Sequence, residues 1–67
     1  MKRYRLLIEG TESVHTNLNK SIILVKNDVL IEVEDKGDVV LVKFENDSNF
    51  RIPLGHFEIS KSKLVEI

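Results

Sequence analysis

Apolar and polar residues alternate along the central stretch of the chain, Asp28–Ile59. Val29, Ile31 and Val33 are β-branched residues at every second position, a period that is typical of a β-strand. Gly37 follows within the sequence Asp-Lys-Gly-Asp, and glycine adopts the positive φ that a tight hairpin turn requires. The pattern therefore predicts a strand, a turn with Gly37 at its tip, and a strand that returns.

Further elements complete this central stretch. The returning strand covers Val39–Glu45, and the polar cluster Asn46–Asn49 predicts a second turn. A third strand is expected over Phe50–Leu54, at a sheet edge because Pro53 has no N–H to donate to a strand ladder. A single 3-10 turn is expected at Gly55–Phe57, before the chain becomes extended again.

The flanking segments follow the same logic. A first strand is predicted over Lys2–Glu9 and ends at Gly10. Thr11–Lys20 is polar, and its pattern indicates a long loop or one helical turn. The apolar run within Ser21–Lys26 predicts a strand that is buried on both faces or that bends at a barrel corner, and the tail Leu64–Ile67 either pairs as a last strand or frays.

Alternation also predicts which side chains form the core. One face of the predicted strands is apolar at nearly every position, and we expect this face to be buried. The expected core comprises Tyr4, Leu6, Ile8, Val29, Ile31, Val33, Val40, Val42, Phe44, Phe50, Ile52 and Leu54.

The order of strands, turns and the Ile-Pro pair resembles that of small SH3-like barrels of the Tudor and KOW type. The residues that carry this resemblance are Val42, Phe44, Ile52, Pro53, Phe57, Glu58 and Ile59. The resemblance implies an all-β fold, a five- to six-stranded SH3-like small barrel that occupies residues 1–67 as a single domain. SH3 and Tudor domains bind ligands through several aromatic side chains, whereas this chain has no Trp and a single Tyr. The resemblance therefore implies no ligand-binding residues.

The residues that can carry chemistry do not form a catalytic or metal-binding motif. The chain has no cysteine, which excludes a disulfide, a thiolate metal site and a cysteine nucleophile. His15 and His56 are the only histidines, and a zinc site would need two further ligands from scattered carboxylates. The glycines are isolated, and no serine lies within a nucleophile motif. We therefore expect no enzyme activity, no metal and no cofactor.

Length and composition indicate one folded domain. The chain has 67 residues, of which 42% are hydrophobic and 31% are charged, as is typical of a soluble globular domain. The apolar run Leu6-Leu7-Ile8 is shorter than the apolar region of a signal peptide, and no stretch approaches the length of a membrane span. These features favour a cytoplasmic protein that does not contact a membrane.

The strand face opposite the expected core is not uniformly polar. It carries Leu7, Leu30, Val39, Leu41 and Pro53, where a half-solvated sheet would carry polar residues. Two interpretations remain open. Either Thr11–Lys20 and the C-terminal tail cover this patch, or the patch contacts a protein partner or a second copy of the chain.

Two groups of basic residues lie far apart in the sequence: Lys2, Arg3 and Arg5, and Arg51, Lys61 and Lys63. If the first strand lies beside the last ones, as barrel closure requires, these side chains form a basic strip that can contact phosphate groups. The alternative is that exposed strand faces and edges carry charges because they meet water. The net charge of −1 provides no overall attraction to nucleic acid.

These observations predict a non-catalytic interaction module, which acts as a protein–protein adaptor or as a regulatory or accessory subunit. Its expected partner is another protein or a second copy of the chain. The alternative is a nucleic-acid-binding small barrel that uses the basic strip.

Overall fold

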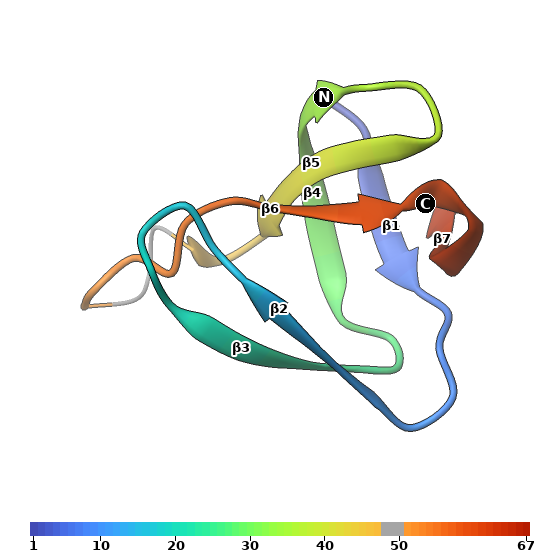
Figure 1. Ribbon diagram of the computed structural model, residues 1–67. Helices are drawn as coiled ribbons and strands as arrows, with labels where there is room; N and C mark the ends of the chain where they lie inside the picture. Colours follow the sequence, from blue (N-terminus) through green and yellow to red (C-terminus); the bar gives the residue numbers. More distant parts are fainter. Residues whose placement is uncertain (48–50) are drawn as a thin grey trace.

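The computed structural model describes residues 1–47 and 51–67, and this part of the chain is built almost entirely from β-strands. Five strands form an antiparallel sheet in the order β6-β5-β4-β1-β7, and the other two form the hairpin β2–β3 (Figure 1). The elements are β1 Arg3–Leu6, β2 Thr11–His15, β3 Ser21–Val25, β4 Val29–Asp35, β5 Val39–Phe44, β6 Phe57–Ser60, the 3-10 helix η2 Lys61–Lys63 and β7 Leu64–Glu66. The prediction of an all-β fold is confirmed, with seven strands in the described residues rather than five or six.

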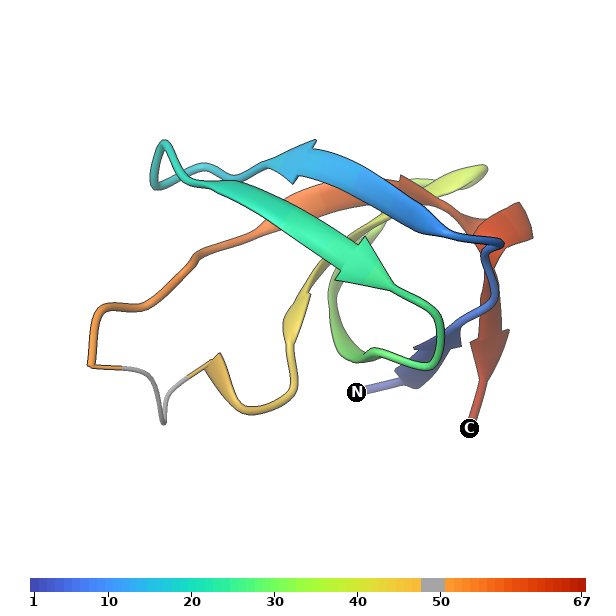
Figure 2. The same cartoon turned by 90° about the horizontal axis from the view of Figure 1, so that it is seen from below.

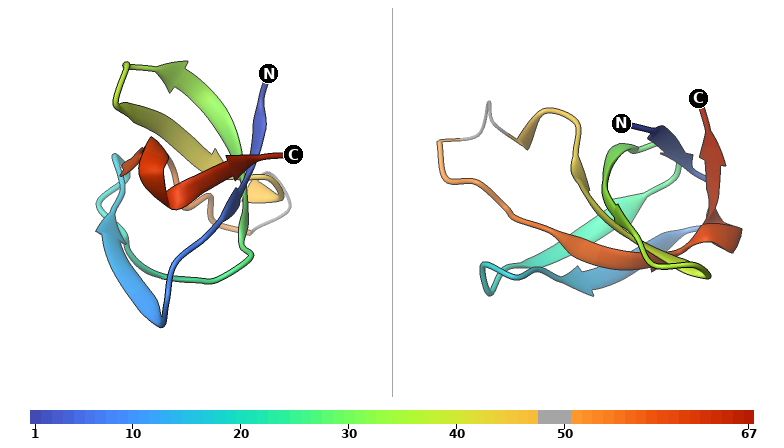
Figure 3. Two further views of the ribbon diagram at one scale, coloured as in Figure 1. Left: turned by 90° about the vertical axis from the view of Figure 1, so that its right-hand side faces the viewer. Right: turned by 90° about the horizontal axis from the view of Figure 1, so that it is seen from above.

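The first strand lies beside the last one. Tyr4 of β1 is opposite Leu30 of β4 on one side and Glu66 of β7 on the other. The N–H of Ile67 donates to the carbonyl oxygen of Arg3 at 3.0 Å, so the two chain ends lie close together, as Figure 3 shows. Within the described part of the chain, the sheet ends at β6 and β7 and does not close into a barrel.

The predicted hairpin tip at Gly37 is confirmed. Gly37 has φ of 97°, a value that favours glycine, and its N–H donates to Asp35 Oδ1 at 2.9 Å. This turn joins β4 to β5. Asn27 has φ of 73° in the turn between β3 and β4, because asparagine tolerates the left-handed region better than most residues.

The hairpin β2–β3 packs over one face of the five-stranded sheet, and the core lies between these two layers (Figure 2). The buried apolar side chains are Tyr4, Leu6, Leu24, Leu30, Val40, Val42, Phe57 and Ile59. Phe44 packs beside this core, with its ring centroid 5.9 Å from that of Phe57 in a tilted arrangement. The predicted core positions Tyr4, Leu6, Val40 and Val42 are confirmed.

The prediction of a loop or a helical turn over Thr11–Lys20 is wrong. Thr11–His15 forms strand β2, and the rest of the segment forms the hairpin tip. Val14 is opposite Ile22, and both side chains pack against the core. The pairing strand supplies the stability that this polar segment lacks by itself, because strand formation depends on cross-strand neighbours more than on intrinsic preference.

Strand β3 is buried on one face only, so the predicted alternative of burial on both faces is wrong for Ser21–Lys26. Leu24 is fully buried, whereas Ile23 and Val25 are 61% and 46% exposed. Because successive side chains of a strand point to opposite faces, the apolar run leaves two large residues on the side of the hairpin that faces away from the core.

The predicted strand over Phe50–Leu54 is also wrong in its described part. Phe50 lies outside the described residues, and residues 51–54 are not strand. Ile52, predicted as a core residue, is 64% exposed. The N–H of Leu54 donates to Asp47 Oδ1 at 2.9 Å instead of to a neighbouring strand. Pro53 has no N–H for a ladder, which explains why strand pairing resumes only after it.

The next strand, β6, begins at Phe57. The 3-10 helix near this strand does not lie where the sequence predicts it. It occupies Lys61–Lys63 rather than the predicted Gly55–Phe57. Its N-cap is Ser60, whose side-chain oxygen accepts a hydrogen bond from the N–H of Ser62 at 3.3 Å. The serine at this position thus satisfies a backbone donor that a single helical turn leaves free.

The predicted orientation of β4 is inverted. Leu30, which is opposite both Tyr4 and Phe44, is fully buried. The residues predicted as core, Val29, Ile31 and Val33, are half-buried or exposed. Both faces of this strand carry apolar residues, so its orientation is set by its neighbours rather than by its own alternation. A register shift between Glu32 and Glu34 interrupts the alternation further along the strand.

Candidate protein-interaction face

The five-stranded sheet has a second face, here called the outer face, which points away from the hairpin. Residues opposite each other in adjacent strands share a face, and Arg3 is opposite Ile31, which in turn is opposite Lys43. Arg5 is likewise opposite Val29 and Val65. Tyr4 and Leu30 face the core, so these neighbouring positions face outward.

Five half-buried apolar side chains lie on the outer face and are here called the outer apolar cluster: Val29, Ile31, Val39, Leu41 and Val65. Val29 and Ile31 follow one another on β4, and Val39 and Leu41 do so on β5. Ile31 is opposite Lys43, so Leu41 is its diagonal neighbour, within the range at which larger side chains touch. The centre of the outer face is therefore apolar.

The predicted contact patch is only partly on this face. Val39 and Leu41 belong to the outer apolar cluster, whereas Leu30 is fully buried, so its placement on an exposed face is wrong. Leu7 is 45% exposed just beyond β1, and Pro53 is exposed in the connection between β5 and β6. The structure does not bring these five residues together as one patch.

Sequence reasoning missed three members of the outer apolar cluster: Val29, Ile31 and Val65. The alternation of β4 predicts the first two as core residues, because the predicted orientation of this strand is inverted. Val65 lies in the tail Leu64–Ile67, for which the sequence predicts either a last strand or a frayed end. The alternation of β4 did contain the signal. A strand with apolar residues on both faces has to place one set outward, and only the identity of that set was open.

Charged residues surround the outer apolar cluster. Arg3 forms an ion pair with Glu45, and this hydrogen bond to the carboxylate raises the pKa of the Arg3 guanidinium. Lys36 donates to Glu58 Oε2 at 2.6 Å, which raises the pKa of the Lys36 ammonium group. Leu41 lies between Glu34 of β4 and Glu58 of β6 in the register.

The predicted basic strip comprises Lys2, Arg3, Arg5, Arg51, Lys61 and Lys63. The pairing of β1 with β7 does bring the N-terminal group near η2 and its neighbours. Four of the six side chains, however, are paired with carboxylates: Lys2 with Glu66, Arg3 with Glu45, Lys61 with Asp35 and Lys63 with Glu12. These carboxylates lower the positive potential that a phosphate group would meet.

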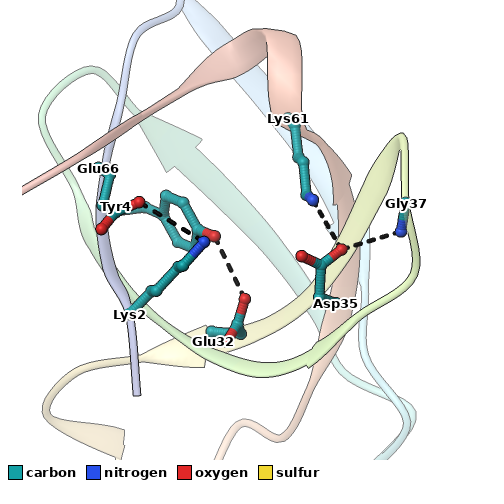
Figure 4. A network of polar contacts seen from close by, with 7 residues as sticks. All are labelled: Lys2, Tyr4, Glu32, Asp35, Gly37, Lys61 and Glu66. Atoms are coloured by element: carbon teal, nitrogen blue, oxygen red, sulfur yellow. Dashed lines mark hydrogen bonds and ion pairs between the residues drawn. The ribbon is translucent and has the colours of Figure 1, made fainter.

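A network of polar contacts lies at one end of the sheet, where β1, β4 and η2 meet (Figure 4). The hydroxyl of Tyr4 donates to Glu32 Oε1 at 3.3 Å. Burial raises the pKa of the Tyr4 phenol, and the negative charge of Glu32 and this hydrogen bond raise it further. The network anchors the only tyrosine of the chain, which is 6% exposed, between the core and the polar end of the sheet.

Asp35 and Lys61 form a separate pair of contacts beside Tyr4 and Glu32, and this pair joins the end of β4 to the 3-10 helix (Figure 4). Lys61 donates to Asp35 Oδ1 at 2.6 Å, and Gly37 donates its N–H to the same oxygen. The contact with Lys61, and next the Gly37 N–H, hold the pKa of the Asp35 carboxyl below its usual range. The same contact raises the pKa of the Lys61 ammonium group.

The two histidines lie in separate structural settings. His15 contacts Asn19 Oδ1 through Nε2 at 2.8 Å and Ser21 Oγ through Nδ1 at 3.4 Å, beside the hairpin tip. His56 precedes β6, and its N–H donates to Asn17 Oδ1 at 2.8 Å. Within residues 1–47 and 51–67, no group of three or more His, Asp or Glu side chains is placed to hold a metal ion.

The surface of the described residues is shallow. No pocket is present over this part of the molecule. No helix in the described residues is long and apolar enough to cross a membrane.

Comparisons with known protein families, curated proteins and solved structures found no match to this chain.

Proposed function

We propose that this protein is a non-catalytic protein-interaction module that binds its partner through the outer face of the five-stranded sheet. The observation that carries the proposal is the outer apolar cluster, five half-buried apolar side chains on a sheet face that the hairpin does not cover. An apolar centre with a charged rim is the usual layout of a protein contact.

The hairpin tip and the C-terminal tail, the two segments of the covering alternative, do not lie over Leu41; β7 lies beside β1 and itself contributes Val65 to the outer face. Val14 of β2 and Leu64 of β7 pack against the core, on the opposite side of the sheet. Leu18, at the hairpin tip, is 49% exposed and lies within 3.2 Å of the position that a Cβ would take at Gly55. Neither segment therefore shields Leu41 and its neighbours, which favours the contact interpretation.

We also propose that the fold is a partly open relative of the SH3-like small barrels. The antiparallel order β7-β1-β4-β5-β6 supports this interpretation, because it places the first strand between the last one and β4. A single 3-10 turn between β6 and β7 and a long excursion, the β2–β3 hairpin, after the first strand also fit it. Such a small barrel without an aromatic groove offers sheet faces rather than a peptide groove for binding.

Comparison of the wild-type chain with the Leu41→Lys variant tests the proposed function. Each tagged protein is used to capture partners from a lysate of the source cell, with and without nuclease treatment. A protein that the wild type retains after nuclease treatment, and that Leu41→Lys loses, supports the proposal. Equal capture by a folded Leu41→Lys variant overturns it.

The nuclease arm also tests the alternative, a nucleic-acid-binding barrel that uses the basic strip. A partner that disappears on nuclease treatment would point to nucleic acid instead of protein. Binding through phosphate contacts would also weaken steeply with salt. The ion pairs of Lys2, Arg3, Lys61 and Lys63 are the reason that we favour the protein partner.

A further inference from the structure

The edges of the two sheets differ in how well they are protected against pairing with another strand. Natural proteins protect a strand edge with charges, proline, a bulge, short length or a covering segment. β7 has only three residues, and β6 carries Glu58 and is contacted at its start by the hairpin tip. β2 carries Glu12, which is bound to Lys63. β3, in contrast, has no charged residue, no proline and no break in its register.

The ladder of the hairpin shows which backbone groups of β3 point outward. The N–H of Thr16 donates to the carbonyl oxygen of Lys20 at 2.8 Å, so this is a hydrogen-bonded pair. Hydrogen-bonded and non-hydrogen-bonded pairs alternate along an antiparallel ladder. Ser21, Ile23 and Val25 therefore direct their backbone N–H and C=O groups away from β2, toward the free edge of β3.

One of these three residues already has partners. The N–H of Val25 donates to Asp28 Oδ2 at 3.0 Å, and its carbonyl oxygen accepts from the N–H of Asp28 at 3.2 Å. Within the described residues, Ser21 and Ile23 have no backbone hydrogen bond on this edge. Ile23 and Val25 are also 61% and 46% exposed beside it. β3 lies on the lower side of the molecule in Figure 1 and is the foremost strand in Figure 2.

We propose that β3 pairs with β3 of a second copy of the chain in antiparallel orientation, so that two hairpins join into one four-stranded sheet. In this arrangement Ile22 is opposite Ile22 of the second copy, on the two-fold axis. Ser21 of each copy is then opposite Ile23 of the other. This register satisfies the free groups of both residues and requires nothing from Val25.

The lysines that flank β3 also favour the register with Ile22 at the two-fold axis. With Ile22 at the two-fold axis, Lys20 is opposite Leu24 of the second copy. If Ile23 were at the axis instead, Lys20 would be opposite Lys26, and like charges directly opposite each other are unfavourable. That register would also require the backbone groups of Val25, which Asp28 already occupies. The uncharged strand with a lysine just beyond each end therefore fits a second copy of itself.

This contact uses the hairpin edge, which is separate from the outer face, so it goes beyond the proposed function. The pairing of β3 and the partner binding at the outer face can therefore be disproved separately. Leu41→Lys changes the outer face and should leave pairing of β3 unchanged, whereas substitutions in β3 should leave partner binding at the outer face unchanged.

Single cysteines test the register, because the chain has no cysteine of its own. In a non-hydrogen-bonded antiparallel pair the Cα atoms are about 4.5 Å apart, within the range of a disulfide. Ile22→Cys should therefore give a disulfide-linked dimer on non-reducing electrophoresis under mild oxidation. Val14→Cys, which is opposite Ile22 on the same face of the hairpin and equally half-buried, is the control for random collision. A yield at Ile22 no higher than at Val14 overturns the proposal.

A second measurement tests the backbone contact. Ile23→Pro removes an N–H that points out of the hairpin, so the intramolecular ladder keeps its bonds. Two hydrogen bonds are lost per dimer, and sedimentation should show association weaker by at least about tenfold. Ile23→Thr keeps the N–H and the β-branched shape, and serves as the control. Equal association of a folded Ile23→Pro variant and the control overturns the proposal.

Amide hydrogen exchange of the wild-type chain decides the case in which Ile23→Pro does not fold. Pairing predicts that protection of the Ser21 and Ile23 amides rises with protein concentration, while that of the Ser13 amide does not. Protection that is independent of concentration, up to the solubility limit, overturns the proposal.

Discussion

Asn17 and His56 join the hairpin tip to the start of β6 through two reciprocal hydrogen bonds. The N–H of Asn17 donates to the carbonyl oxygen of His56 at 2.9 Å, and the N–H of His56 donates to Asn17 Oδ1 at 2.8 Å. Gly55, with φ of 95°, lies directly beside this contact. A Cβ at Gly55 would lie 2.4 Å from Asn17 Oδ1 and 2.9 Å from Leu18 Cγ.

Loss of the Asn17 side chain should loosen the hairpin tip. Asn17→Ala removes the acceptor of the His56 N–H and should lower the free energy of unfolding by about 1 kcal/mol, the usual value for one hydrogen bond. Asn17→Asp keeps an acceptor oxygen at the same place and is the matched control. Chemical denaturation measures both. Equal losses in the two variants would show that the hydrogen bond does not contribute.

A side chain at Gly55 should be more costly than one at Gly10. Both glycines have positive φ, 95° and 75°, so Ala carries a backbone penalty of about 1–2 kcal/mol at either position. At Gly10 a Cβ meets nothing within 4 Å, whereas at Gly55 it meets the hairpin tip. We expect Gly55→Ala to lower the unfolding free energy further than Gly10→Ala does. Equal effects would contradict the close packing of the tip.

Truncation of Leu30 and Ile52 should separate the true core from the predicted one. Leu30 is fully buried, so Leu30→Ala should cost about 2–5 kcal/mol of unfolding free energy, a large part of the stability of a domain of this size. Ile52 is 64% exposed, and Ile52→Ala should change stability by less than about 0.5 kcal/mol. Thermal unfolding of both variants tests the expectation, and a larger loss for Ile52→Ala would contradict it.

The sequence predicted individual strands and turns better than the way in which the strands pair and orient. The Gly37 hairpin and the strands β1, β4 and β5 follow from nearest-neighbour patterns, because turn chemistry and period-two alternation are local properties. The inverted orientation of β4 could not be predicted, since Leu30 and its neighbours Val29 and Ile31 are equally apolar. Only the positions of Tyr4 and Phe44, distant in sequence, decide which set is buried.

The same limit explains the other misplaced elements. β2 is a polar segment that becomes a strand through pairing with β3, and no local signal reveals that partner. The candidate face was recognised through Val39 and Leu41, because their parity within β5 was assigned as the structure has it. The placement of Leu30 on this face is wrong, because the predicted orientation of β4 is inverted.

The titration of Tyr4 should report its environment without interference. It is the only tyrosine, and the chain has no tryptophan, so the ultraviolet absorbance of tyrosinate follows this one group. Burial, and then the charge of Glu32, raise its pKa above the ordinary value of 10.0. Glu32→Gln should lower this pKa, although burial still keeps it raised. A wild-type titration at or below the ordinary value would contradict the burial of the phenol.

The sign of the effect on stability follows from the same shift. The folded protein holds the phenolic proton more tightly than the unfolded chain does. Well below pH 10.0 the phenol is protonated in both the folded and the unfolded state, so Tyr4 contributes no pH dependence to stability in this range. As the pH rises above this value towards the folded pKa, the unfolded chain loses the proton first, so stability falls. This fall should be smaller in Glu32→Gln, as measured by denaturation over the alkaline range.

Charge at Leu41 provides the sharpest test of the outer face. In the register, Leu41 lies between Glu34 and Glu58. Leu41→Glu would therefore place three carboxylates in a row across three strands, which destabilises the sheet itself by like-charge repulsion. Leu41→Lys instead places a cation between two carboxylates, so it removes the apolar contact while it leaves the fold supported.

The two variants together separate a contact residue from a structural one. If Leu41 contacts a partner, both variants lose association in light scattering or capture, and Leu41→Lys keeps a melting temperature close to that of the wild type. If Leu41 serves only the fold, both variants melt lower and association with the partner persists wherever the chain remains folded. Val33→Lys, at an exposed position of β4 within the register shift, is the matched control and should preserve both properties. Retention of the partner by a folded Leu41→Lys variant would show that recognition lies outside the outer apolar cluster.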